Sequence, residues 1–531
     1  MTAVFSNTPA VSKRWILALI SLPIFIGALD LTVVSAVLPQ VIFDLEIPIQ
    51  TGLDEAAWIV TGYLLAYSVA MTFMGRLSDL YGRRRIFLLA LAIFAFGSYL
   101  VAVADGWPTQ LMLRAYYLLA SGRPDPARVG LLALIGARMI QAFGGGAMVP
   151  VGMALVGDIY PAGERSRPLG FIAAVDTAGW VVGHLYGGII VRTFNWRLIF
   201  WLNLPACLIA FLLIVFALRG LPFPRVRGRM DWLGAALIAA SLTFINLGLG
   251  SPEAGGALTS AGDTAAVDLA QLGAGAMLLF IFIGWQARSR SPLIPLGLFR
   301  RPNFTPAAGA NFLIGFSLFI AIANVPLFIN TLMVNNLEQG AWESGWMLSA
   351  LTVPMALTAV PGGWWTARRG YRWPGVAGIL LALAGFGLMS TWRATTTYGE
   401  MVPHLVLTGI GFGLTLAPIA TAAVDAAPDT DRGIASGLVI ILRLVGLRIG
   451  VSSITTFGLH RTGVLYEQML SPSMTLAETV QAVVRAAEIV IDESFLIAGA
   501  VCAAALIPTA LLARAPANGL KGGHDDGRAG F

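Results

Sequence analysis

The stretch that decides the fold lies between two long apolar segments and reads Gly75-Arg76-Leu77-Ser78-Asp79-Leu80-Tyr81-Gly82-Arg83-Arg84-Arg85. It combines one acid and several arginines with two glycines. Glycine has no Cβ, so Gly75 and Gly82 allow two helix ends to approach closely. Asp79 can form charge-assisted hydrogen bonds with arginines across an interface. A merely basic loop explains the arginines but not the glycines or the acid, so the pattern indicates a close contact between helices.

The composition around this stretch is that of a membrane protein. The chain has 531 residues, of which 57% are hydrophobic and 12% are charged, whereas soluble domains carry about 25% charged residues. A spanning helix needs about 20 apolar residues, and the sequence predicts fourteen such segments. They are residues 15–38, 57–74, 86–104, 129–157, 169–190, 198–218, 232–250, 269–287, 305–331, 344–363, 374–391, 402–424, 434–457 and 495–514.

The basic residues are unevenly distributed between the two membrane faces. If the N-terminus is inside, most of the 34 lysines and arginines fall in inner segments. The positive-inside rule then predicts a multi-pass protein of the cell membrane with both termini in the cytoplasm. Because the net charge of +6 is scattered along one face, it argues against a nucleic-acid partner. Cys207 and Cys502 lie in apolar segments, so we expect buried helix residues and no metal site.

Asp30 is an acid inside the first apolar segment. A charge there is costly, which makes an intramembrane acid a candidate functional residue. A carboxyl shielded from water favours its protonated form and can carry a proton. The alternative is a structural acid that pairs with a neighbouring helix.

The stretch from Gly75 to Arg85 resembles the signature loop of the major facilitator superfamily, Gly-x-x-x-Asp-x-x-Gly-Arg-Arg/Lys. A weaker echo occupies residues 363–372, where Gly363 and Gly370 match the two glycines and Ala367 stands in place of the acid. Two homologous halves leave such an echo.

Other stretches resemble the fourteen-helix drug:proton antiporter subfamily. They are Asp30 with its neighbours from Leu29 to Pro39, Arg138 to Gly145, Trp196 to Pro205, Pro292 to Arg300, and Gly433 to Arg443. The resemblance implies an all-α membrane protein with the major facilitator fold, two six-helix bundles and two extra linker helices. The expected parts are a cytoplasmic N-terminus (1–14), an N-terminal bundle (15–218), a linker (219–304), a C-terminal bundle (305–515) and a cytoplasmic tail (516–531).

The same resemblance implies roles for particular residues. A conformational lock would consist of Gly75, Asp79, Gly82, Arg83 and Asp158. A helix-packing motif would consist of Gly179, Gly183, Gly187 and Gly188. His184 follows Gly183 where the antiporter pattern has proline; it is either a second proton carrier or a histidine bonded to a neighbouring helix.

Two further sets of polar residues lie in apolar segments. Arg138 would neighbour Asp30 and favour its charged form, so burial and Arg138 act on it in opposite directions. With Asp176 and His184 they form the predicted proton-coupling set. The candidates for the substrate cavity are Asn311, Asn324, Asn330 and Arg443, although asparagines also serve as contacts between helices.

Two segments on the predicted outer face are unusually long. Residues 105–128 mix aromatic and basic side chains, which suits an interfacial helix. Residues 460–493 carry apolar side chains at helical spacing, which predicts a surface helix resting on the bundle. A gate or a docking site for a partner is the alternative for the second segment.

We therefore expect a monomeric secondary transporter that exports lipophilic compounds, cationic ones included, in exchange for protons. The bundles would rock around a central cavity, with the proton gradient as energy source and no cofactor. The substrate would be a small lipophilic molecule or a lipid, and membrane lipids would surround the protein. The alternatives are a lipid or glycolipid exporter of the same fold and a non-transporting membrane sensor. An enzyme is disfavoured, since no Walker loop, metal cluster or nucleophile elbow occurs in the sequence.

Overall fold

The structure is a computed structural model that describes residues 12–45, 49–119, 125–219, 228–249, 268–334, 337–471 and 474–513. Regular structure in these ranges is helical. The helices are α1 (Lys13–Asp44), α2 (Ile49–Tyr81), α3 (Arg83–Ala102), α4 (Trp107–Leu119), α5 (Pro126–Ile159), α6 (Ser166–Thr193), α7 (Arg197–Ala217), α8 (Trp232–Gly248), α9 (Leu269–Arg288), η1 (Leu296–Arg300), α10 (Phe304–Phe328), η2 (Ile329–Met333), α11 (Leu337–Arg369), α12 (Arg372–Met389), α13 (Tyr398–Ala426), α14 (Arg432–Met469), α15 (Leu476–Ala504) and α16 (Leu506–Ala510).

Thirteen helical stretches among the described residues are long and apolar enough to cross a membrane. The shorter apolar helix α8 would be the fourteenth. The chain is thus an all-α, multi-pass membrane protein, while the number of fourteen spans stays a prediction that depends on α8.

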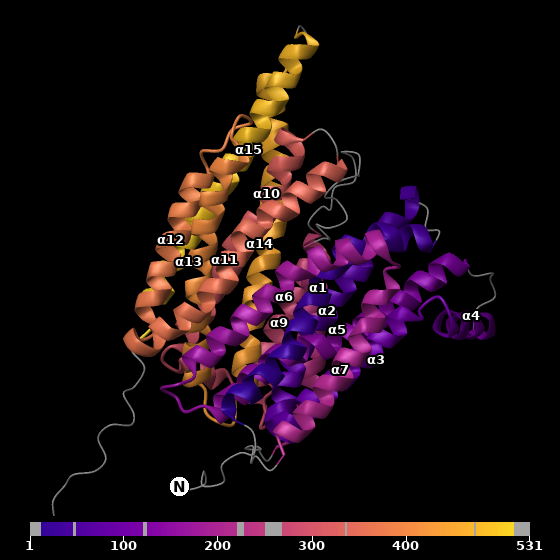
Figure 1. Ribbon diagram of the computed structural model, residues 1–531, viewed down its shortest axis with the longest axis vertical. Coiled ribbons are helices and arrows are strands. Elements are labelled where there is room, and N and C mark those ends of the chain that lie inside the picture. The colour runs from indigo at the N-terminus through magenta and orange to yellow at the C-terminus, as the bar shows by residue number, and fades with distance from the viewer. Residues whose placement is uncertain are drawn as a thin grey trace, which may run out of the picture.

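The spanning helices form two bundles, one made of α1–α3 and α5–α7 and the other of α10–α15 (Figure 1). Helices α8 and α9 pack against each other, and α8 also contacts α2. Residues 12 and 513 lie at one end of the molecule, which we call the termini end. Figure 1 shows the two bundles meeting near this end and diverging towards the other.

The signature loop (residues 75–85) and its weaker copy (residues 363–372) have similar backbone geometry. Gly82 and Gly370 have φ values of 98° and 80°, in the left-handed region that favours glycine. A Cβ on Gly75 would lie 2.7 Å from the carbonyl oxygen of Gly433, and one on Gly363 would lie 2.4 Å from that of Ser166. Both glycines therefore sit where a helix of one bundle crosses a helix of the other.

The expectation of a separate surface helix in residues 460–493 is wrong. Helix α14 continues to Met469, and α15 begins at Leu476 and runs without a break into its spanning part. Thr475 and Glu478 form a capping box at the start of α15. Such a box pairs free N–H groups of a helix start and so stabilises the helix from this residue onward.

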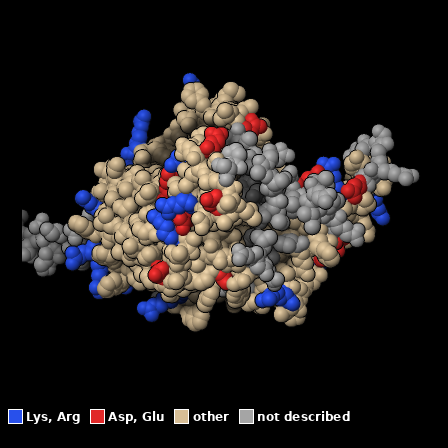
Figure 2. All heavy atoms as spheres, turned by 90° about the horizontal axis from the view of Figure 1, so that it is seen from above, with Lys and Arg blue, Asp and Glu red and all other residues tan. Residues whose placement is uncertain are grey.

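The ends of α14 and α15 form a helical hairpin that projects from the C-terminal bundle (Figure 1). Leu465, Ala486 and Val490 pack between its two arms, and Arg461 forms an ion pair of 2.7 Å with Glu493. We call this the hairpin end of the molecule. Figure 2 looks onto it and shows acidic and basic side chains interspersed among uncharged ones.

Candidate functional site

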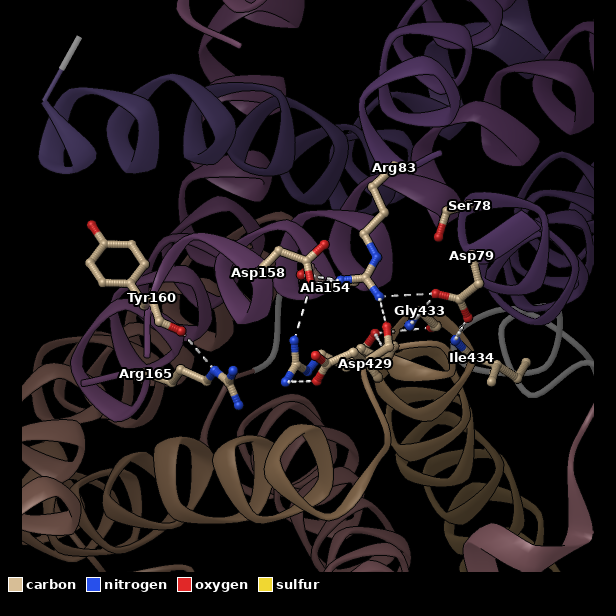
Figure 3. A network of polar contacts seen from close by, with 12 residues as sticks. Ser78, Asp79, Arg83, Ala154, Asp158, Tyr160, Arg165, Asp429, Gly433 and Ile434 are labelled. Carbon is tan, nitrogen blue, oxygen red and sulfur yellow. Dashed lines mark hydrogen bonds and ion pairs between the residues drawn. The ribbon is translucent and has the colours of Figure 1, made fainter. Parts of the chain in front are cut away.

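Asp79 joins the two bundles at the termini end. It lies in the last turn of α2 and is buried. Its two carboxylate oxygens accept hydrogen bonds from the backbone N–H groups of Gly433 (3.0 Å) and Ile434 (3.1 Å), as Figure 3 shows. These residues begin α14, and a helix start carries unpaired N–H groups and a partial positive charge. Asp79 thus caps a helix of the opposite bundle.

Arg83 connects Asp79 to two further segments (Figure 3). Its guanidinium is fully buried and donates to the Asp79 carboxylate (3.2 Å) and to the carbonyl oxygens of Ala154 and Asp429 (both 2.8 Å). It also forms an ion pair with Asp158. The predicted lock residues Asp79, Arg83 and Asp158 therefore meet at one place.

Additional ion pairs between the bundles surround this centre. They are Arg432–Asp158 (3.1 Å), Arg76–Asp431 (2.9 Å) and Arg165–Asp425 (2.7 Å). We call Arg76, Asp79, Arg83, Asp158, Asp429, Asp431 and Arg432 the charge cluster. The sequence analysis missed its two acids from the second half, Asp429 and Asp431, which the fold places against the basic loop.

Asp30 and Arg138 form a second, deeply buried network within the N-terminal bundle. Asp30 is 0% exposed, and one of its carboxylate oxygens accepts a hydrogen bond of 2.8 Å from Arg138. The other oxygen accepts from Gln141 (2.9 Å) and from Asn203 (3.4 Å). The structure thus places Arg138 beside Asp30, as expected.

Aromatic and polar side chains complete this network. The Arg138 guanidinium lies 4.1 Å from the centre of the Tyr63 ring, a favourable cation–π geometry. The Gln141 amide also donates to the Ser98 hydroxyl at 2.8 Å. Sequence analysis did not single out Tyr63 or Ser98, and it gave no role to Gln141 and Asn203, which lie in stretches matched to the antiporter subfamily; their common signal is a polar side chain in an apolar segment.

This arrangement can exchange an ion pair for a proton. A proton on the Asp30 carboxylate removes the negative charge that pairs with Arg138. Asp30 can therefore hold either the proton or the ion pair with Arg138, but not both. An unpaired buried charge is strongly unfavourable. Proton binding would therefore require Arg138 to move or to find another partner.

A third polar pair lies between the bundles. Asp176 on α6 and Arg443 on α14 approach to 3.6 Å. They line a cavity of about 40 Å³ whose other walls are mainly aliphatic, including Ile172, Leu416 and Ile440. Asn311 borders the same cavity, and its amide donates to the Val439 carbonyl at 2.8 Å.

The remaining predicted residues are more scattered. Asn324 is buried on α10 away from this cavity, and the Asn330 amide donates to the Pro326 carbonyl at 2.8 Å. A Cβ on Gly179 or Gly183 would lie 2.8 or 2.5 Å from backbone oxygens of α1. Both glycines therefore allow α6 to pack closely against α1.

Two glycines and one histidine of the α6 motif remain. Gly187 is buried, whereas a Cβ on Gly188 would meet no atom within 4 Å of the described structure. The side chain of His184 lies outside the described residues, so its proposed proton-carrying role stays a prediction.

Comparisons with known proteins agree with this architecture. The profile of the Major Facilitator Superfamily matches residues 20–451 and 310–531. A probable triacylglyceride transporter of Mycobacterium leprae (strain TN) is 31% identical over 508 residues, covering 91% of this chain and 92% of that protein. A triacylglyceride transporter of Mycobacterium tuberculosis (strain ATCC 25618 / H37Rv) is 33% identical over 457 residues, covering 83% and 82%.

Solved structures with a similar fold are more distant in sequence. A proton:xylose symporter superposes with a TM-score of 0.58 at 13% identity, covering 91% of this chain and 94% of that one. A human organic anion transporter gives 0.55 at 14% identity, covering 93% and 100%. At these identities the structures inform the fold alone.

Proposed function

The chain belongs to the major facilitator superfamily, and from this premise we propose that it moves a neutral lipid of the triacylglycerol class in exchange for protons. It is a transporter and not an enzyme. The relatives named as triacylglyceride transporters resemble it over almost its whole length, which supports a lipid substrate over a cationic drug.

The chemistry of the inter-bundle cavity carries this proposal. Its walls are mainly aliphatic, and its one acid, Asp176, is paired with Arg443. A neutral lipid gains about 0.8 kcal/mol for each CH₂ group that it buries and needs no counter-charge. A cation would need an unpaired acid, whereas both Asp176 and Asp30 already face arginines.

We propose that the charge cluster is the conformational lock of the transport cycle. It joins the bundles at the termini end. The cavity of about 40 Å³ is far smaller than the roughly 300–1,000 Å³ of a pocket for a drug-sized ligand, and so far too small for a lipid. Lipid binding therefore requires the bundles to rock apart.

Proton coupling is assigned to Asp30 and Arg138. Because the proton and the ion pair exclude each other, protonation of Asp30 would release Arg138 and alter the packing of α1 against α5. Asp30 would then have a different proton affinity in each of the two arrangements of the bundles. Proton binding would thereby shift the equilibrium between these arrangements. Asp176 is a second candidate because it faces Arg443 across the bundles.

A binding panel tests the substrate. We expect triacylglycerol to raise the melting temperature of the purified protein, while lipophilic cations and dyes leave it unchanged. Ala420→Trp would fill the cavity and should abolish the stabilisation by triacylglycerol, whereas the control Gly387→Ala changes a glycine with no neighbour within 4 Å. Stabilisation by cations and not by triacylglycerol would overturn the lipid assignment.

A further inference from the structure

We propose that α4 is a lipid-binding helix that lies in the membrane interface at the hairpin end, with acyl chains against its exposed apolar side chains and phospholipid phosphate at Arg114. Figure 1 shows α4 projecting sideways from the N-terminal bundle. This inference does not depend on what the protein transports.

The side chains of α4 divide into two sides. Trp107, Leu111 and Leu118 recur at the spacing of one helix face, and they are 46%, 58% and 85% exposed. Arg114 is also exposed and lies on the same face between Leu111 and Leu118, with exposed Gln110 at the edge of that face. The apolar face has no cover in the described structure, and exposed apolar stripes of this kind mark interaction surfaces.

The opposite side attaches the helix to the bundle. Thr109 is buried, and its hydroxyl donates to the Ala104 carbonyl at 2.6 Å. A Cβ on Gly130, near the start of α5, would meet Thr109 at 3.8 Å. The orientation of α4 is therefore fixed at its first turn, and the apolar face has a defined direction.

The position of α4 along the bundle corresponds to the membrane boundary. Helix α3 has 20 residues and ends at Ala102. At 1.5 Å per residue this is about 30 Å, the thickness of the hydrocarbon core. Because α4 begins at Trp107, only five residues later, it lies at the level where hydrocarbon gives way to headgroups.

A chain of aromatic side chains extends the lipid-facing surface of the bundle onto α4. The Trp107 indole N–H donates to the Tyr99 hydroxyl at 3.4 Å. The Tyr99 ring in turn makes an edge-on contact with Trp201 of α7 at 6.1 Å between centres. Trp and Tyr gather at membrane interfaces because they combine an apolar ring with a polar group. The apolar face of α4 thus continues an existing membrane-facing surface.

The charge on α4 fits a phospholipid rather than bare hydrocarbon. Arg114 is exposed within the apolar face, and an arginine guanidinium matches phosphate geometry. An arginine in such a place lays its methylene groups along apolar surface and extends its charged end to the headgroups. The ligand is therefore a phospholipid of the leaflet at the hairpin end, and α4 would hold the N-terminal bundle at a fixed depth while the other bundle rocks.

Spin labels on the apolar face and at its edge test this placement. In a Cys207→Ala, Cys502→Ala background, nitroxides would be attached to Leu111→Cys and Leu118→Cys on the apolar face, and to Gln110→Cys and Tyr117→Cys as matched controls. The protein would be studied in nanodiscs of phosphatidylethanolamine and phosphatidylglycerol. Collisions with oxygen report hydrocarbon, and collisions with a water-soluble nickel chelate report solvent.

We expect the ratio of oxygen to nickel collisions to be higher at 111 and 118 than at 110 and 117. Equal nickel access at all four sites would overturn the proposal, as would labels at 111 and 118 that are shielded from both reagents by a protein. Arg114→Glu should increase nickel access at 118, whereas Arg114→Lys should not. Equal behaviour of the two variants would overturn the phosphate contact. No readout involves transport, so failure here leaves the proposed lipid substrate untouched.

Discussion

Residues 75–85 and 363–372 follow the same backbone course in the two bundles but carry different charges. In both, the first glycine lies against the backbone of the opposite bundle, and the second has positive φ. Asp79 is buried against the start of α14, whereas Ala367, at the matching position, is exposed. The glycines allow helices of the two bundles to cross closely, and such a crossing is present at both segments. The acid makes a charge contact with the opposite bundle, and this contact is present only at Asp79.

This difference teaches what each part of the motif does. Close crossing needs only the absence of a Cβ, so Gly75 and Gly363 suffice for it. Capping a helix start needs an acid that faces it, which the fold offers to Asp79 and not to position 367. We therefore expect the two crossings to respond differently to substitution, and the predictions below run from the largest effect to the smallest.

Asp79→Asn should have the largest effect, because it destabilises the state in which the two bundles are joined at the termini end. Removing one partner of a buried ion network costs about 3–5 kcal/mol, because Arg83 would lose one of its two acids and the start of α14 would lose its charged cap. The measurement is labelling of Ala420→Cys, beside the cavity, by a membrane-impermeant thiol reagent in the Cys207→Ala, Cys502→Ala background. We expect the rate to rise about 100-fold or more, and an unchanged rate would show that the charge cluster is not a lock.

Tyr371→Phe should destabilise the C-terminal bundle beside the other crossing, and by less, since Asp425 also pairs with Arg165 of the N-terminal bundle. The Tyr371 hydroxyl donates to Asp425 at 2.8 Å, and a hydrogen bond to a charged group contributes about 1.5–3 kcal/mol. Burial raises the pKa of Tyr371 above its ordinary value. The contribution of this hydrogen bond to the free energy of unfolding should therefore be constant below the ordinary tyrosine pKa of about 10 and decline at higher pH. Melting of both proteins across this range checks the prediction, and a difference that grows with pH would contradict it.

Gly75→Ala and Gly363→Ala should each destabilise their crossing by about 1–3 kcal/mol through overpacking. The effect at Gly363 should be at least as large, because the added Cβ would lie closer to the opposing oxygen. Gly387→Ala is the matched control, since nothing described lies within 4 Å of its added Cβ. Thermal unfolding in nanodiscs measures all three, and a control that loses as much stability would refute the close-contact explanation.

Ala367→Asp should have the smallest effect. It restores the acid of the motif, but at an exposed position, where substitutions usually change stability by less than about 0.5 kcal/mol. We expect labelling of Ala420→Cys to stay at the wild-type rate. A large decrease would mean that the acid forms a second latch and that the two crossings are interchangeable.

The sequence predicted the parts of the site that depend on local pattern. Asp79 and Arg83 are four residues apart across the turn between α2 and α3, and the glycine spacing identified the crossing. Asp30 and Arg138 could be anticipated because a charge in an apolar segment needs a partner. Each of these inferences required only the chemistry of a residue and its immediate neighbours.

The missed parts depend on tertiary structure. The acids Asp425, Asp429 and Asp431 resemble any polar turn until the fold brings Asp425 to Arg165, and the other two to the basic loop of the other bundle. Gln141 and Asn203 become conspicuous only when their amides converge on one carboxylate. The hairpin was missed because amphipathic spacing looks the same in a surface helix and in the extension of a spanning helix.

Proton movement in proteoliposomes that contain Asp30→Asn tests the central claim most directly. Addition of triacylglycerol to the wild-type protein should drive protons across the membrane, and a pH-sensitive dye inside the vesicles would record it. Asp30→Asn should fold, insert and still bind triacylglycerol, but move no protons. Proton movement by this variant at the wild-type rate would contradict the assignment of Asp30 as the coupling site.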